Sequence, residues 1–99
     1  MTRNIVWSPR SRSNYFQLLE YLDDTWGPMS VKKFNTRFNK VLDQIATHPD
    51  LYPATMKKSN TRCCVLSKQT TLYYRVKKKE IELVTLFDNR KHPSKKKLQ

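Results

Sequence analysis

Residues Thr71–Arg90, TLYYRVKKKEIELVTLFDNR, are the basis of the fold that we predict for this chain of 99 residues. Both arms of the stretch are dominated by β-branched and aromatic residues, and the charged run Lys77–Glu80 separates them. This composition is typical of two β-strands that fold against each other as a hairpin.

Side chains on a strand alternate between the two faces of its sheet, so the two faces of each arm can be assigned. The first arm has apolar side chains on one face, Leu72, Tyr74 and Val76, and its other face carries Tyr73, Arg75 and Lys77. In the second arm we expect one face to hold Ile81, Leu83, Thr85 and Phe87, and the opposite face to hold Val84 and Leu86. Apolar residues on both faces predict that the second arm is an interior strand.

The N-terminal half predicts one short strand and two helices. Asn4–Ser8 is a short apolar strand, and Ser8-Pro9 is a helix start because serine caps a helix and proline suits its first turn. Gly27-Pro28 ends the first helix, and His48-Pro49 ends the second. Each helix has one apolar stripe that we expect in the core: Tyr15, Leu18, Leu19, Leu22 and Trp26 in the first, and Val31, Phe34, Phe38, Val41, Leu42 and Ile45 in the second.

Between the helices and the hairpin, Arg62–Lys68 is a further strand, whereas the prolines of Asp50–Asn60 predict a loop. We therefore predict an α+β fold, a small antiparallel sheet of about four strands packed against an N-terminal helical hairpin. The expected order is one strand, two helices and three strands. Residues 1–93 are expected to form a single domain, and residues 94–99 a basic flexible tail.

The charge of the chain is strongly positive and unevenly distributed. The formal net charge is +12, and residues 57–99 alone carry thirteen Lys or Arg against three acids. A polyanion is the natural partner of such a surface, whether it is nucleic acid, an acidic protein or an anionic membrane.

The sequence predicts neither a metal site nor a membrane segment. Cys63 and Cys64 are adjacent in a strand and face opposite sides, which makes a disulfide between them geometrically poor. No second pair of Cys or His lies at ligand spacing, so we expect no metal. The chain has no long apolar run and no apolar core of a signal peptide, so we expect a cytoplasmic protein.

Three arginines, Arg62, Arg75 and Arg90, fall at or near predicted strand ends. An arginine on an open sheet face can bind phosphate in a fixed orientation, and Lys57 and Lys58 precede the strand that begins at Arg62. The alternative is that each arginine is a solvated charge or pairs with a carboxylate.

Four short motifs occur in a distinctive order along residues 5 to 93. They are Ser8-Pro9 at the first helix, Ile45–Pro49 (IATHP), Leu72–Val76 (LYYRV) and Leu86–Pro93 (LFDNRKHP). With the predicted order of elements, this set resembles the RelE/ParE superfamily of toxins from type II toxin-antitoxin systems, which includes plasmid stabilisation proteins.

This resemblance implies a small toxin that a cognate antitoxin protein neutralises in a hetero-oligomer, without a cofactor. RelE-like members cut mRNA on the ribosome, and ParE-like members poison DNA gyrase. For RNA cleavage, the resemblance implies catalytic roles for Arg62, Arg75, Arg90 and His92, and contacts with nucleic acid from Lys57, Lys58, Tyr73, Lys77 and Lys91.

The chain departs from the RelE-type pattern near its end. Those nucleases commonly place a tyrosine or a His-Tyr pair close to the C-terminus, whereas here Pro93 follows His92 and no tyrosine follows Tyr74. The ending is more similar to the ParE branch, so both targets remain open. Two other functions are also consistent with the sequence: a non-catalytic basic module that binds nucleic acid, and a degenerate toxin that retains only antitoxin binding.

Overall fold

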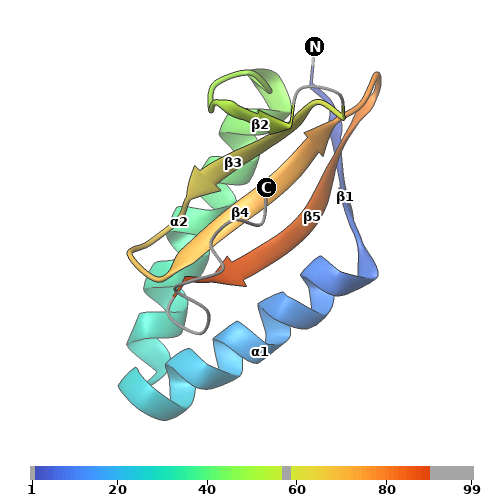
Figure 1. Cartoon of the computed structure of the whole chain (residues 1–99). Coiled ribbons are helices and arrows are strands. Elements are labelled where there is room, and N and C mark those ends of the chain that lie inside the picture. The colour runs from blue at the N-terminus through green and yellow to red at the C-terminus, as the bar shows by residue number, and fades with distance from the viewer. Residues whose placement is uncertain (1, 57–58, 90–99) are drawn as a thin grey trace.

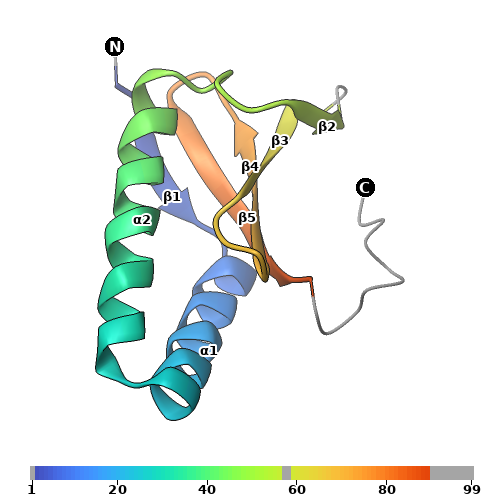
Figure 2. The same ribbon diagram turned by 90° about the vertical axis from the view of Figure 1, so that its left-hand side faces the viewer.

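The computed structural model describes residues 2–56 and 59–89. The elements are β1 (Asn4–Trp7), α1 (Pro9–Trp26), α2 (Pro28–Thr47), β2 (Ala54–Met56), β3 (Thr61–Val65), β4 (Thr70–Val76) and β5 (Glu80–Asp88). The two helices form a hairpin that covers one face of a single sheet (Figures 1 and 2). The α+β fold and the packing of an N-terminal helical hairpin on the sheet are thus confirmed.

The sheet has five strands in the order β1-β5-β4-β3-β2, and it is mixed rather than purely antiparallel. β1 pairs with β5 in parallel, so that Ile5 lies beside Ile81. The extra strand, β2, lies within the segment for which we expected a loop, and it pairs with the start of β3. The two-helix connection carries the chain across one face of the sheet, which allows β1 to pair in parallel with the last strand.

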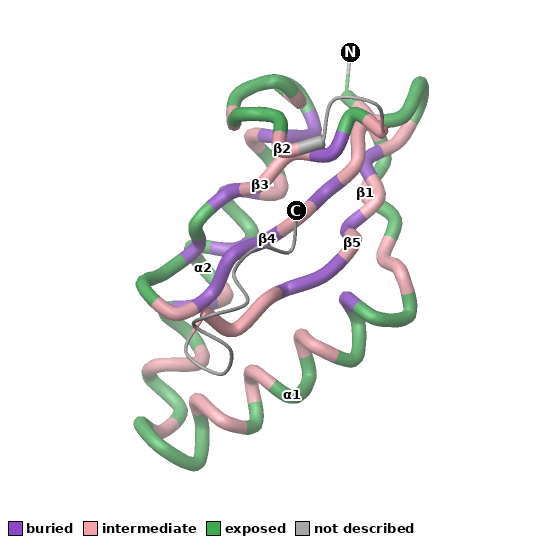
Figure 3. Tube along the Cα trace, viewed as in Figure 1, coloured by how far each residue is buried: buried purple, intermediate pink, exposed green. Residues whose placement is uncertain are grey.

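The core lies between α2 and the middle strands of the sheet. Phe38, Val41 and Ile45 of α2 are buried against Leu72 and Tyr74 of β4. Buried residues run along β4 and β5 in the centre of the sheet (Figure 3). Of the predicted stripe on α1, Tyr15, Leu18, Leu19 and Leu22 pack against this core from one side. Neither described helix combines the length and the apolar content that crossing a bilayer would require.

Trp26 is an exception to the predicted stripe, because it is 64% exposed rather than buried. It lies in the last turn of α1, where the tip of the helical hairpin extends past the sheet (Figure 1). Periodicity identifies the face of a helix but not where its partner ends.

The helix ends follow the local signals. The side chain of Ser8 accepts a hydrogen bond from the Ser11 backbone N–H at 3.0 Å, as a helix cap does. Gly27 separates the helices with φ +92° and ψ 177°, a backbone conformation that is essentially restricted to glycine.

A β-bulge in β5 alters the predicted division of its faces. Tyr73 pairs with Thr85 and Tyr74 pairs with Leu83, which leaves Val84 as an extra residue. The extra residue reverses the alternation, so Leu86 joins Leu83 in the core. The expectation that Phe87 shares the face of Leu83 is therefore wrong.

Polar groups from the N-terminal half hold this bulge. The Ser8 hydroxyl donates to the carbonyl of Val84 at 2.9 Å, and the Ser8 N–H donates to the carbonyl of Leu83 at 3.1 Å. The side-chain oxygen of Asn14 accepts from the Thr85 hydroxyl at 2.7 Å and from the Leu86 N–H at 3.2 Å. The start of α1 is thus bonded directly to β5.

Candidate polyanion-binding site

Arg62 lies on the helix-covered face of the sheet. Its register partner on β4 is the buried Tyr74, and side chains that are paired across two strands point the same way. The guanidinium Nη1 donates to the backbone carbonyl of Tyr52 at 2.6 Å, and the Tyr74 hydroxyl donates to the carbonyl of Pro49 at 2.9 Å. Arg62 and Tyr74 therefore attach the segment after α2 to the sheet.

The environment of Tyr74 reflects this packing. Burial raises the pKa of Tyr74 to about 12, although the neighbouring Arg62 charge acts in the opposite direction. Tyr74 stays neutral at physiological pH, so it is a structural hydrogen-bond donor rather than a proton acceptor.

Arg75 lies on the opposite face, which neither described helix covers and which we call the open face (Figure 2). Its register partner is Glu82, and Arg75 Nη1 lies 3.1 Å from Glu82 Oε1. Lys77 Nζ lies 3.4 Å from the same oxygen. One carboxylate thus partly neutralises two of the predicted phosphate-binding cations, which is the ion-pair alternative that the sequence left open.

Further cations gather at the same end of the sheet. Arg3 Nε donates to the carbonyl of Lys77 at 2.9 Å, and the exposed Lys78 and Lys79 form the turn between β4 and β5. We call the set Arg3, Arg75, Lys77, Lys78 and Lys79 the cationic corner. No sequence pattern indicates a role for Arg3, because only the parallel pairing of β1 with β5 brings it here.

Tyr73 is half-buried on the open face, opposite Cys63 of β3. Burial raises the pKa of Tyr73, and the nearby Cys63 adds to the increase. A phenol whose pKa is raised is a poor general base near neutral pH. Both cysteines are free, as expected, with Cys64 buried on the other face.

The predicted site residues that the structure describes do not form a single group. Arg62 lies on the helix-covered face of the sheet, whereas Tyr73, Arg75 and Lys77 share the open face. Five predicted residues lie outside the part of the chain that the structure describes: Lys57, Lys58, Arg90, Lys91 and His92.

Comparisons with solved structures place this geometry in a known fold, although no protein-family model and no curated protein matches the sequence. The chain is similar to a chromosomal ParDE toxin-antitoxin structure from P. aeruginosa, with a TM-score of 0.70 and 13% identity over 88% of this chain and 96% of that one. It is also similar to a YoeB/ParE toxin from Agrobacterium tumefaciens, with a TM-score of 0.63 and 14% identity over 86% and 96% of the two chains.

A third similar structure is the DinJ-YafQ toxin-antitoxin complex from E. coli. Its TM-score is 0.61, at 9% identity over 92% of this chain and 97% of that one. The resemblance seen in the sequence is thus confirmed at the level of the fold: the chain has the fold of the RelE/ParE superfamily toxins.

Proposed function

We propose that this chain is the toxin of a type II toxin-antitoxin system, which arrests bacterial growth and is neutralised by a cognate antitoxin in a hetero-oligomer. The proposal is supported by the fold, because three structures from such systems match between 86% and 92% of the chain. The net charge of +12 is consistent with an acidic protein partner. The proposed site of action is the cytoplasm.

Of the two targets, DNA gyrase fits the described geometry better than mRNA on the ribosome. Metal-independent RNA cleavage requires an acid, a base and several cations around one phosphate. The observation that carries this choice is the orientation of two arginines, since Arg62 and Arg75 lie on opposite faces of the sheet. Inhibition by binding requires no such convergence.

Ribosome-dependent mRNA cleavage is the second candidate, and one observation favours it. Tyr73, Arg75 and Lys77 share the open face. In this version Arg75 and Lys77 would bind phosphate, and Tyr73 would stack on a base. Arg90 would add positive charge and His92 would be a proton donor. Arg62 would only stabilise the fold.

Two reactions with the purified, folded chain test these targets. One measures supercoiling of relaxed plasmid by gyrase, and the other measures the integrity of mRNA on translating ribosomes. We expect loss of supercoiling and intact mRNA. Cut mRNA with normal supercoiling would favour ribosome-dependent mRNA cleavage instead. In that case Arg75→Gln should reduce the cleavage. If both reactions are normal and the chain binds naked duplex DNA tightly and in a salt-dependent way, its function would instead be that of a basic nucleic-acid-binding module.

A further inference from the structure

The turn between β4 and β5 carries three consecutive lysines on a braced backbone. Lys77–Glu80 closes as a tight turn, since the Lys77 N–H donates to the carbonyl of Glu80 at 2.9 Å. The start of β1 holds this turn, because Arg3 Nε donates to the carbonyl of Lys77 at 2.9 Å and the Asn4 N–H donates to the carbonyl of Lys79 at 3.2 Å. Figure 1 shows the turn beside the N-terminal end of β1. The lysines therefore extend from a backbone that is already ordered, so an anion that binds them has less conformational entropy to remove.

The oxygen of one carboxylate shows where an anion is held in the cationic corner. Glu82 Oε1 lies 3.1 Å from Arg75 Nη1 and 3.4 Å from Lys77 Nζ, so two cations converge on it. A phosphate oxygen is an anionic acceptor of the same kind, and it could replace the carboxylate oxygen between these two donors. Glu80 and Glu82 are the acids at this end of β5, against the five cations of the corner. The positive charge of the corner is therefore only partly neutralised.

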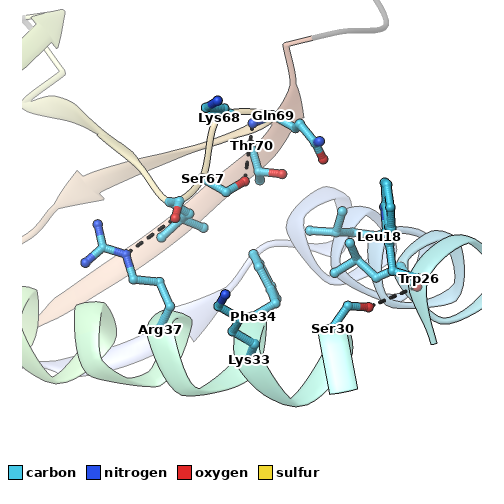
Figure 4. Close-up of a pocket in the computed structure, with 12 residues that line it drawn as sticks. Leu18, Trp26, Ser30, Lys33, Phe34, Arg37, Ser67, Lys68, Gln69 and Thr70 are labelled. Atoms are coloured by element: carbon cyan, nitrogen blue, oxygen red, sulfur yellow. Dashed lines mark hydrogen bonds between the residues drawn. The ribbon is translucent and has the colours of Figure 1, made fainter. Parts of the chain in front are cut away.

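The cationic corner offers charge but little apolar surface. Of the exposed large apolar side chains in the described part of the chain, only Val6 pairs in register with a residue at this end of β5, and it is 39% exposed. The apolar side chains Trp26 and Phe34 line a hollow beside the β3–β4 turn, at the opposite end of β4 (Figure 4). A protein interface has an apolar and often aromatic centre, and binding to a membrane surface requires side chains that insert below the headgroups. The corner meets neither requirement.

We propose that the cationic corner binds the phosphate backbone of duplex DNA, independently of base sequence. Lys78 and Lys79 would contact phosphates from the tip of the turn. Arg75 and Lys77 would exchange the carboxylate of Glu82 for a phosphate oxygen. Contacts of this kind neutralise phosphates and release their counterions, so they provide affinity without reading the bases.

The absence of a stacking surface favours a duplex over a single strand. Proteins that bind single strands stack the bases on aromatic side chains, and none of the five residues of the corner is aromatic. Tyr73 lies on the same face, two residues before Arg75, but it is half-buried. The inference rests on the proposed function, because DNA gyrase acts on duplex DNA. A contact with that DNA would raise the local concentration of the toxin near the enzyme.

Fluorescence anisotropy of a labelled duplex of about 20 base pairs, titrated with the full chain in about 0.1 M salt, tests the inference. We expect the double variant Lys78→Glu with Lys79→Glu to weaken binding by about tenfold or more. The slope of log K against log salt should decrease by about 2, because each phosphate contact contributes about 0.9. The matched control is Lys32→Glu with Lys40→Glu, which changes the net charge equally at exposed positions of α2 and should weaken binding by less than about threefold. Glu82→Gln should strengthen binding by about twofold or more, because it frees two cations.

Three results would overturn the inference: equal weakening by the control variant, unchanged affinity of the folded Lys78 and Lys79 variant, or tighter binding of a single strand of the same length. Absence of duplex binding by the unmodified chain would also overturn it. Supercoiling by gyrase, measured with the same preparations, separates this result from the proposed function. Duplex binding through the corner without inhibition of gyrase would keep the DNA site and refute the gyrase target. Inhibition of gyrase by a chain that does not bind duplex DNA would refute the DNA site and keep the target.

Discussion

Replacing Tyr74 with Phe removes one hydroxyl from the most buried part of the sheet and leaves the ring in place. The hydroxyl donates to the Pro49 carbonyl at 2.9 Å, and the residue is 0% exposed. A net intramolecular hydrogen bond contributes about 1 kcal/mol to stability, so Tyr74→Phe should lower the free energy of unfolding by about that amount at pH 7.

The same substitution has a distinct signature in alkali. Burial raises the pKa of Tyr74 from 10.0 to about 12, so between these values the folded protein keeps a proton that the unfolded chain releases. The free energy of unfolding that this difference in pKa contributes is fully present below pH 10 and is lost as pH rises through 12. The total loss is about 2 to 3 kcal/mol. The variant has no such loss. Its stability curve should therefore cross that of the wild type between pH 10 and 12.

Urea denaturation at pH values from 7 to 12, followed by circular dichroism, measures both effects. The difference between the two proteins cancels the titration of groups that they share. Curves that stay parallel over the whole range, or equal stabilities at pH 7, would refute the assigned hydrogen bond and burial.

Gly27→Ala should lower the free energy of unfolding by about 1 to 3 kcal/mol, because φ +92° is strained for any side chain even though the added Cβ meets no atom within 4 Å. A neutral effect in urea denaturation would contradict the assigned turn. Asn14→Ala should lower the free energy of unfolding by about 1 to 3 kcal/mol, because it leaves the Thr85 hydroxyl and the Leu86 N–H without their acceptor. Asn39→Ala, on the exposed side of α2, should change the free energy of unfolding little. Glu82→Gln should free Arg75 and Lys77, so the variant should elute from heparin at higher salt than the wild type, and an unchanged elution would count against the ion pairs.

Features that depend on neighbouring residues could be predicted from the sequence. The bounds of α1 follow from Ser8-Pro9 and from Gly27-Pro28, because caps and turns act within a few residues. The hairpin of β4 and β5 follows for the same reason, since its two strands are joined by a short charged turn.

Features that depend on distant segments could not be predicted. The bulge at Val84 is held by Ser8 and Asn14, which are about seventy residues away in the chain. Arg3 reaches the cationic corner only because β1 pairs in parallel with β5. Alternation alone separates the faces of a strand without identifying which face the helices cover, so the side on which Arg62 lies depends on tertiary packing.

The growth of bacteria in which this chain is expressed alone shows whether the protein is a toxin. Optical density and colony counts are followed after induction, and circular dichroism of the purified protein shows that it is folded. We expect growth to stop after induction, and simultaneous expression of the cognate antitoxin to restore it. Unchanged growth in cells that contain the folded chain would contradict the assignment of this protein as a toxin.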